Sequence, residues 1–182
     1  MNTNNINREH KATLFAKLFG EDKENALSLY NAVNNSHYTN ADDLIFTTLD
    51  DVVYMKMKND VSFLIDRTLS LYEHQSTYNP NMPLRGFLYF ADLYRQQIKN
   101  NAAIYSRYRV KIPTPKYVVF YNGDSKDMPE EVKELYLSDA FEIPVEQGKF
   151  EWTATMININ HGQNAKLKEK CTVLQEYTVF VE

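Results

Sequence analysis

The chain has 182 residues, of which 43% are hydrophobic and 24% charged, proportions typical of one globular domain with a filled core rather than of a disordered chain. Its apolar runs are too short to cross a bilayer and its Asn-rich N-terminus lacks the apolar core of an export signal, so we expect a cytoplasmic protein without a membrane partner. A single cysteine, Cys171, excludes an internal disulfide and a cysteine-based zinc site, and the net charge of −4 disfavours nucleic-acid binding unless basic residues cluster.

In chain order, the pattern begins with a polar tail at residues 1–9 and continues as a single domain at 10–182. Helical spacing of apolar residues predicts a first helix over 8–19, which ends at Gly20. The later predicted elements are a helix at 22–35 capped by Asp22, a strand at 44–49, a hairpin at 60–78, a helix at 83–100, a buried strand at 117–121, a charged and partly helical insertion at 128–141, a strand at 153–159 and a helix at 164–180. This order predicts an α/β fold with a mixed central sheet flanked by helices.

Two of these helices have a predicted apolar side that should face the core. In the helix after the hairpin, apolar residues three or four apart form this side: Leu84, Phe87, Leu88, Ala91, Tyr94 and Ile98. In the last helix the corresponding side consists of Leu167, Cys171, Leu174 and Tyr177.

The hairpin has the clearest local pattern, because side-chain types alternate with a period of two on both sides of Arg67–Thr68. A turn centred there places Asp60 opposite Gln75. Side chains alternate along a strand, so Asp60, Glu73 and Gln75 share one face, with the Cα atoms of Asp60 and Glu73 roughly 7–8 Å apart as diagonal neighbours. A loop of odd length would put the two carboxylates on opposite faces, so this prediction depends on the register.

Two carboxylates at that separation can share a divalent cation. Magnesium prefers oxygen ligands and keeps several waters, so one or two carboxylates suffice to hold it. A metal bound there would stabilise the charge that develops during phosphodiester hydrolysis and lower the pKa of the attacking water. Gln75 lies two residues after Glu73 on the same face, where it can position that water.

Five short blocks, in order along the chain, also carry a resemblance. They are Leu14–Gly20 (LFAKLFG), Lys58–Asp66 (KNDVSFLID), Leu71–Ser76 (LYEHQS), Asn81–Gly86 (NMPLRG) and Pro115–Gly123 (PKYVVFYNG). With the pattern Asn59-Asp60 … Glu73-His74-Gln75 on a hairpin between two helices, they resemble the PD-(D/E)XK nuclease superfamily. More narrowly they resemble the recombination-promoting nuclease family, whose members are often described as transposases. The likeness covers about residues 10–182.

The resemblance implies a restriction-endonuclease-like core and an endonuclease that hydrolyses DNA phosphodiester bonds with Mg²⁺ or Mn²⁺ and takes part in DNA recombination. It implies that Asp60 and Glu73 are metal ligands and that the backbone carbonyl of His74 is a further ligand. Gln75 stands in the place of the superfamily's lysine and Asn59 in the place of its proline. A glutamine can orient water, but it cannot neutralise a developing oxyanion as lysine would.

Further candidates have two readings each. Arg85, near the start of the helix after the hairpin, can reach a substrate phosphate, and Glu24 can supply an extra acidic ligand. The alternative for Glu24 is a solvated glutamate favoured by the helix dipole. The basic groups Arg85–Arg95–Lys99 and Arg107–Arg109–Lys111 are either phosphate contacts or solvated faces. The His74 side chain should point away from the carboxylates and have a structural role.

The sequence leaves a second function open, namely a catalytically degenerate nuclease fold that binds nucleic acid or a protein partner. The missing lysine and the acidic net charge favour it. An unrelated α/β enzyme has no motif to support it, because the chain lacks a Gly-rich phosphate loop, a Ser-centred elbow and a His-rich metal set. Self-association into a homo-oligomer also stays open.

Overall fold

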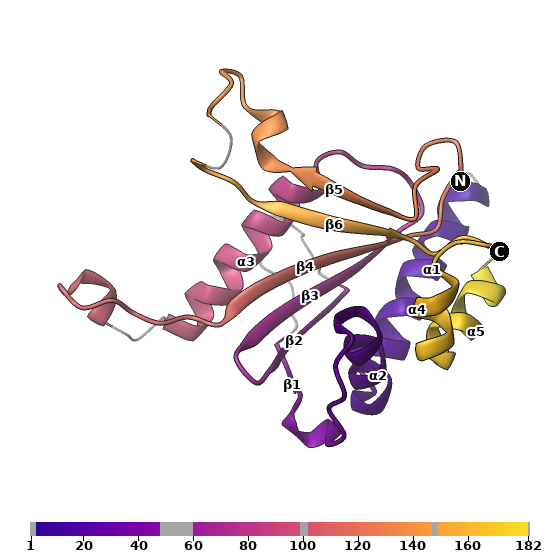
Figure 1. The fold of residues 1–182 in the computed structure, drawn as a ribbon, viewed down its shortest axis with the longest axis horizontal. Coiled ribbons are helices and arrows are strands. Elements are labelled where there is room, and N and C mark those ends of the chain that lie inside the picture. The colour runs from indigo at the N-terminus through magenta and orange to yellow at the C-terminus, as the bar shows by residue number, and fades with distance from the viewer. Residues whose placement is uncertain (1–2, 48–59, 99–101, 147–148, 182) are drawn as a thin grey trace.

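The computed structural model describes residues 3–47, 60–98, 102–146 and 149–181, and in this part of the chain a mixed sheet lies between two groups of helices (Figure 1). The helices are α1 (Thr3–Gly20), α2 (Lys23–Asn34), α3 (Met82–Ile98), α4 (Ala165–Lys170) and α5 (Thr172–Val181), with short 3-10 turns at Ala41–Asp43, Ala102–Tyr105 and Leu137–Ala140. The strands are β1 (Ile45–Phe46), β2 (Val61–Ile65), β3 (Thr68–Gln75), β4 (Thr114–Tyr121), β5 (Val132–Tyr136) and β6 (Thr153–Asn158). None of the described helices is both long and apolar enough to cross a membrane.

The six strands lie in the order β1-β2-β3-β4-β6-β5. Strand β3 pairs in parallel with β4, and β4 in parallel with β6, whereas the other neighbours are antiparallel. Helix α3 connects the parallel strands β3 and β4 and covers one face of the sheet (Figure 1). The predicted α/β class with a mixed sheet flanked by helices is therefore confirmed.

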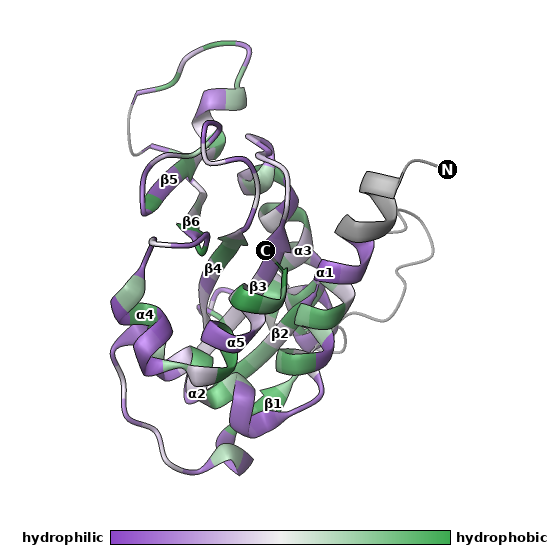
Figure 2. Cartoon of the chain, turned by 90° about the vertical axis from the view of Figure 1, so that its right-hand side faces the viewer, coloured by the Kyte–Doolittle hydropathy of each residue, from purple (hydrophilic) through white to green (hydrophobic). Residues whose placement is uncertain are grey.

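Two hydrophobic clusters cover the two faces of the sheet, and hydrophobic residues are concentrated along its strands (Figure 2). On one face, side chains of α1, α2 and α5 pack against alternate residues of β4, including Val118 and Phe120. On the other face, α3 packs against Tyr117, Val119 and Tyr121 of the same strand. Strand β4 is thus buried on both sides, which explains its continuous apolar run.

The N-terminal prediction needs a correction, because residues 3–9 belong to helix α1 and not to a tail. Extending an existing helix requires no new nucleation step, so polar residues at its start can be helical although they show no apolar periodicity. Helix α2 is confirmed together with its cap: the side chain of Asp22 accepts a 3.0 Å hydrogen bond from the backbone N–H of Asn25. The predicted strand at 44–49 is described only as far as residue 47 and is paired at Ile45–Phe46.

The predicted apolar side of α3 is wrong. Leu84 and Phe87 are 43% and 37% exposed, and the side that faces the sheet consists of Met82, Pro83, Gly86, Tyr89, Phe90 and Leu93. The reason is Gly86, since a Cβ atom there would lie 2.4 Å from the ring of Tyr117. The absence of that atom lets the helix approach the sheet closely at Gly86. Glycine is not counted as apolar when the buried side of a helix is predicted from hydrophobic spacing, so the prediction missed this side.

The insertion at 128–141 is helical only in the 3-10 helix Leu137–Ala140, and most of the rest is strand β5, which the sequence pattern did not predict. Strand β5 pairs antiparallel with β6 at the edge of the sheet. Its charged residues Lys133 and Glu134 are typical of an edge strand, and they concealed its alternation in the sequence. The last predicted helix is divided at Cys171 into α4 and α5.

Candidate functional site

The register of the hairpin differs from the prediction by one residue at the turn. The ladder begins with Ile65 opposite Thr68, so its continuation places Asp60 opposite Glu73 and not opposite Gln75. The shift moves every partner by two positions along the opposite strand. Because two positions is one full repeat of the strand, the faces are unchanged and the carboxylates of Asp60 and Glu73 still lie on the same side, towards α3.

The turn explains this shift. It consists of Asp66 and Arg67, and Asp66 adopts a left-handed φ of 51°. Aspartate tolerates this conformation better than most residues with a side chain, whereas the β-branched Thr68 is favoured in a strand. The turn therefore closes one residue earlier than the polar break in the sequence suggests.

Asp60 lies immediately before β2 and is anchored to β3. Its Oδ2 atom accepts a 2.7 Å hydrogen bond from the backbone N–H of His74. Burial raises the pKa of Asp60 to about 6, although this hydrogen bond and the charge of Arg85 both favour the ionised form. The carboxylate is thus held at the end of the hairpin, beside Glu73.

Glu73 is the most deeply buried acidic group of the site, with 1% of its surface exposed. Burial raises its pKa to about 8, and the charge of Asp60 adds to the effect, while Arg85 opposes it. The Nη2 atom of Arg85 lies 3.0 Å from Oε2 of Glu73 as an ion pair, but neither carboxylate oxygen makes a hydrogen bond of ordinary geometry to the described residues. Among the described residues, Arg85, Tyr117 and Gln75 approach Glu73 without giving its oxygens a hydrogen bond of ordinary geometry, so its lone pairs are incompletely satisfied.

Two tyrosines complete this side of the site. The hydroxyl of Tyr89 accepts a hydrogen bond from Nη2 of Arg85 at 3.3 Å. The hydroxyl of Tyr117 is buried and has no hydrogen-bond partner among the described residues, and it lies close enough to Glu73 to lower the pKa of that carboxyl. The sequence pattern identified Tyr117 only as part of a strand, because its approach to Glu73 depends on the parallel pairing of β3 with β4.

The side chain of His74 points to the opposite face, as expected. Its ring packs against Phe15 and Tyr177, with ring centroids 6.0 Å and 5.6 Å apart. Neither ring nitrogen has a hydrogen-bond partner in the described part of the chain, and burial lowers the pKa of His74 to about 3. The side chain is therefore a neutral core group, while the role of its backbone carbonyl as a metal ligand stays a prediction.

The other predicted residues divide between the site and the surface. Gln75 ends β3 beside Glu73 and lowers the pKa of that carboxyl. Arg85 contacts Glu73, where the sequence predicted a contact to substrate phosphate. Glu24 is exposed in the first turn of α2. Asn59 lies outside the described residues, which contain no group of three or more His, Cys, Asp or Glu side chains able to hold a metal. Among the described residues, an ion here would thus have at most two acidic side-chain ligands.

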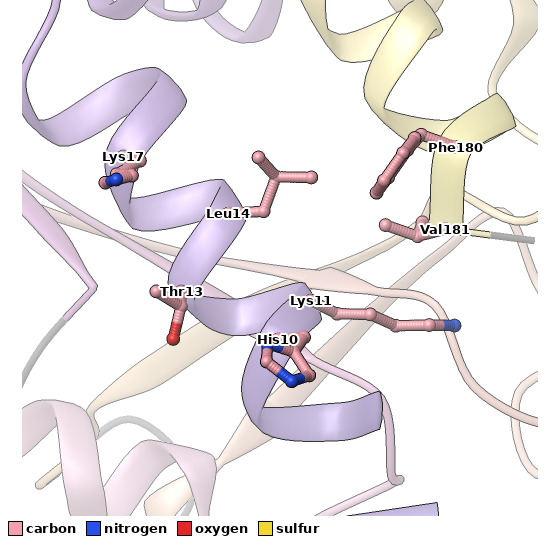
Figure 3. Close-up of a pocket in the computed structure, with 7 residues that line it drawn as sticks. All are labelled: His10, Lys11, Thr13, Leu14, Lys17, Phe180 and Val181. Atoms are coloured by element: carbon pink, nitrogen blue, oxygen red, sulfur yellow. The ribbon is translucent and has the colours of Figure 1, made fainter. Parts of the chain in front are cut away.

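A separate cleft of about 420 Å³ lies between α1 and α5. Leu14 of α1 faces Phe180 and Val181 of α5 across it, and His10 and Lys17 lie along its α1 side (Figure 3). Neither Asp60 nor Glu73 lines this cleft. It is therefore distinct from the carboxylate site.

No protein-family model, curated protein or solved structure matches the chain. Function must be inferred from the chemistry of the site itself.

Proposed function

We propose that the protein is a metal-dependent DNA endonuclease of the PD-(D/E)XK type, with a restriction-endonuclease-like core and with Asp60 and Glu73 as ligands of Mg²⁺ or Mn²⁺. One observation carries the proposal: Glu73 is buried beside a second carboxylate, and within the described residues its ion pair with Arg85 is not accompanied by any hydrogen bond of ordinary geometry to either oxygen. The resemblance of the five sequence blocks to recombination-promoting nucleases supports it independently.

The two carboxylates fit a divalent cation. A buried carboxylate whose hydrogen bonds are incomplete is costly in the ionised form, and a cation would satisfy its remaining lone pairs. Asp60 uses Oδ2 for the backbone of His74 and keeps its other oxygen for a ligand. A magnesium ion completes its shell with water, so a pair of carboxylates on adjacent strands is sufficient.

When bound, the metal would stabilise charge on the phosphate and make the attacking water more acidic. The residues of the chain have the remaining roles. Gln75 accepts a hydrogen bond from the water and orients it, and the hydroxyls of Tyr89 and Tyr117 can donate to phosphate oxygens. Arg85 leaves Glu73 for the scissile phosphate, which exchanges one anionic partner for another and frees Glu73 for the metal.

A plasmid-cleavage assay tests the proposal. Wild type, Glu73→Gln and Asp60→Ala are incubated with supercoiled DNA and Mg²⁺, and a chelator serves as the metal-free reference. Of these three proteins, we expect only the wild type to nick the plasmid. The matched control is Glu134→Gln, which removes an exposed carboxylate at the far edge of the same sheet and should cut normally. Equal cutting by all four proteins would refute the assignment.

A second candidate function is nucleic-acid or protein binding without cleavage. It is favoured by the Arg85–Glu73 ion pair, which already neutralises the site, and by glutamine in the place of lysine at position 75. Calorimetric titration with Mn²⁺ separates the two candidates. A nuclease site should bind Mn²⁺ in the wild type and lose that binding in Glu73→Gln, whereas a degenerate site should show no difference between the two proteins.

A further inference from the structure

An exposed segment rich in basic and aromatic residues lies at the end of the sheet opposite to Glu73. Residues Ile104–Ile112, here named the basic arm, connect α3 to β4 and project from the body of the protein (Figure 1). Every residue from Ile104 to Arg109 is exposed. The arm carries alternating cationic and aromatic side chains in the sequence IYSRYRVKI. Nothing in the proposed cleavage chemistry uses it.

The charge around the arm is opposite to that of the whole protein. No acidic residue occurs between Asp92 and Asp124, although the net charge of the chain is −4. The basic residues in that interval are Arg95, Lys99, Arg107, Arg109, Lys111 and Lys116. A region of one sign within an acidic protein concentrates the potential that attracts a polyanion.

Within the described residues, no acidic side chain forms an ion pair with the cations of the arm. None of the ion pairs in the described part of the chain includes Arg107, Arg109 or Lys111. The guanidinium of Arg107 instead lies 5.2 Å from the centroid of the Tyr108 ring, and its Nη2 donates to the Tyr108 hydroxyl at 3.2 Å. A solvated face would show charges of both signs, so three unpaired cations favour a ligand.

The aromatic side chains of the arm are unusually accessible. Tyr105 is 93% exposed and Tyr108 is 70% exposed. Tyrosine rings held in water present flat apolar surfaces on which unpaired bases stack, and every base offers such a surface whatever its sequence. Aromatic rings that stack on bases and cations that bind phosphates are the two components of sequence-independent single-strand binding.

We propose that the basic arm binds single-stranded nucleic acid, with Tyr105 and Tyr108 stacked on bases and Arg107, Arg109 and Lys111 in contact with phosphates.

The position of the arm connects it to the carboxylate site. The backbone N–H of Thr114, at the start of β4, donates to the carbonyl of Arg67 at 2.8 Å, so the arm leaves the sheet at the turn of the hairpin. Glu73 lies about 16 Å along β3 from that end. Helix α3 runs back over the same distance, with Arg85 near its start and Arg95 near its end. A strand held by the arm can therefore extend along α3 towards Glu73, although binding itself needs no metal.

Fluorescence anisotropy in the presence of a chelator tests the proposal. The probe is a labelled oligothymidylate of about 20 nucleotides, which is longer than the about 4–16 nucleotides that single-strand binding folds cover. The triple variant Arg107→Gln, Arg109→Gln, Lys111→Gln should bind at least about tenfold more weakly. The slope of its log affinity against log salt concentration should be smaller in magnitude by about 2. The double variant Tyr105→Ala, Tyr108→Ala should lose at least about fivefold in affinity for each ring removed. The double variant Tyr105→Phe, Tyr108→Phe keeps both rings and should retain binding. Measuring binding in chelator separates this proposal from the nuclease proposal, because cleavage would need the metal whereas the stacking and phosphate contacts of the arm do not.

The matched control removes three exposed lysines elsewhere: Lys126→Gln, Lys149→Gln and Lys166→Gln. Thermal unfolding of the arm variants and of the control triple should be unchanged because the residues substituted in them are exposed. The proposal is overturned if the wild type does not bind, or if the control triple weakens binding as much as the arm triple. It is also overturned if polyglutamate competes as well as oligothymidylate at equal charge, or if duplex DNA binds equally and the alanine variants have no effect.

Discussion

The carboxylate of Asp60 accepts a 2.7 Å hydrogen bond from the backbone N–H of His74, the residue that follows Glu73 in β3. This contact holds the start of β2 against β3 beyond the last paired residues. It also fixes one acidic side chain beside another, which is unfavourable because burial disfavours the ionised form of both carboxyl groups. Such an arrangement is typical of a functional site, where local stability is lower than it could be.

Two substitutions of Asp60 separate the hydrogen bond from the charge. Asp60→Ala leaves the N–H of His74 without its acceptor and should lower the free energy of unfolding by about 1–3 kcal/mol. Asp60→Asn keeps an acceptor oxygen and should lower the free energy of unfolding by less, since burial already disfavours the charged form of Asp60. Urea unfolding measures both. In the plasmid assay each variant should be inactive, and cutting by Asp60→Asn at the wild-type rate would contradict a ligand role.

His74 predicts a pH dependence of stability. Its pKa is about 3 in the folded protein and near the usual 6.5 in the unfolded chain, so the unfolded state binds a proton first as the pH falls. The stability that neutral His74 contributes is complete above pH 6.5 and is lost progressively as the pH falls towards 3. His74→Phe, which preserves a ring against Phe15 and Tyr177, should reduce this loss. A variant with the same acid sensitivity as the wild type would exclude His74 as the cause.

Gly86 is expected to be required for the packing of α3 against the sheet. A Cβ atom would lie 2.4 Å from two ring atoms of Tyr117, so Gly86→Ala must move the helix or the ring. The overpacking cost of about 1–3 kcal/mol should exceed the gain of up to about 1 kcal/mol in helix propensity. Chemical denaturation measures the difference, with Gln96→Ala on the exposed side as the control. A more stable Gly86→Ala protein would show that this contact is loose.

Cys171 should be protected from thiol reagents in the folded protein. Its side chain is fully buried at the junction of α4 and α5, and burial raises the pKa of the thiol. Both effects lower the concentration of reactive thiolate at the surface. Labelling with a disulfide reagent should therefore be slow in buffer and fast in urea. Equal rates in the two conditions would show that α4 and α5 separate readily in the native state.

Local signals in the sequence were sufficient for several elements. The cap of α2 at Asp22 and the buried strand that became β4 depend on neighbouring residues alone, and both are confirmed. The shared face of Asp60 and Glu73 also survived a shift in register, because the strand repeat is two residues. The apolar side of α3 was predicted wrongly and strand β5 was not predicted, because the close approach at Gly86 and the pairing at the sheet edge depend on residues distant in the chain.

The sequence by itself thus determined the alternation that brings two carboxylates to one face of a hairpin, because side-chain direction along a strand is a local property. Only the tertiary structure decided what surrounds them. Parallel pairing of β3 with β4 brings Tyr117 to Glu73, and the crossover helix α3 places Arg85 against the same carboxylate. These contacts join residues distant in the chain, and they are set by how the helices and the sheet pack together.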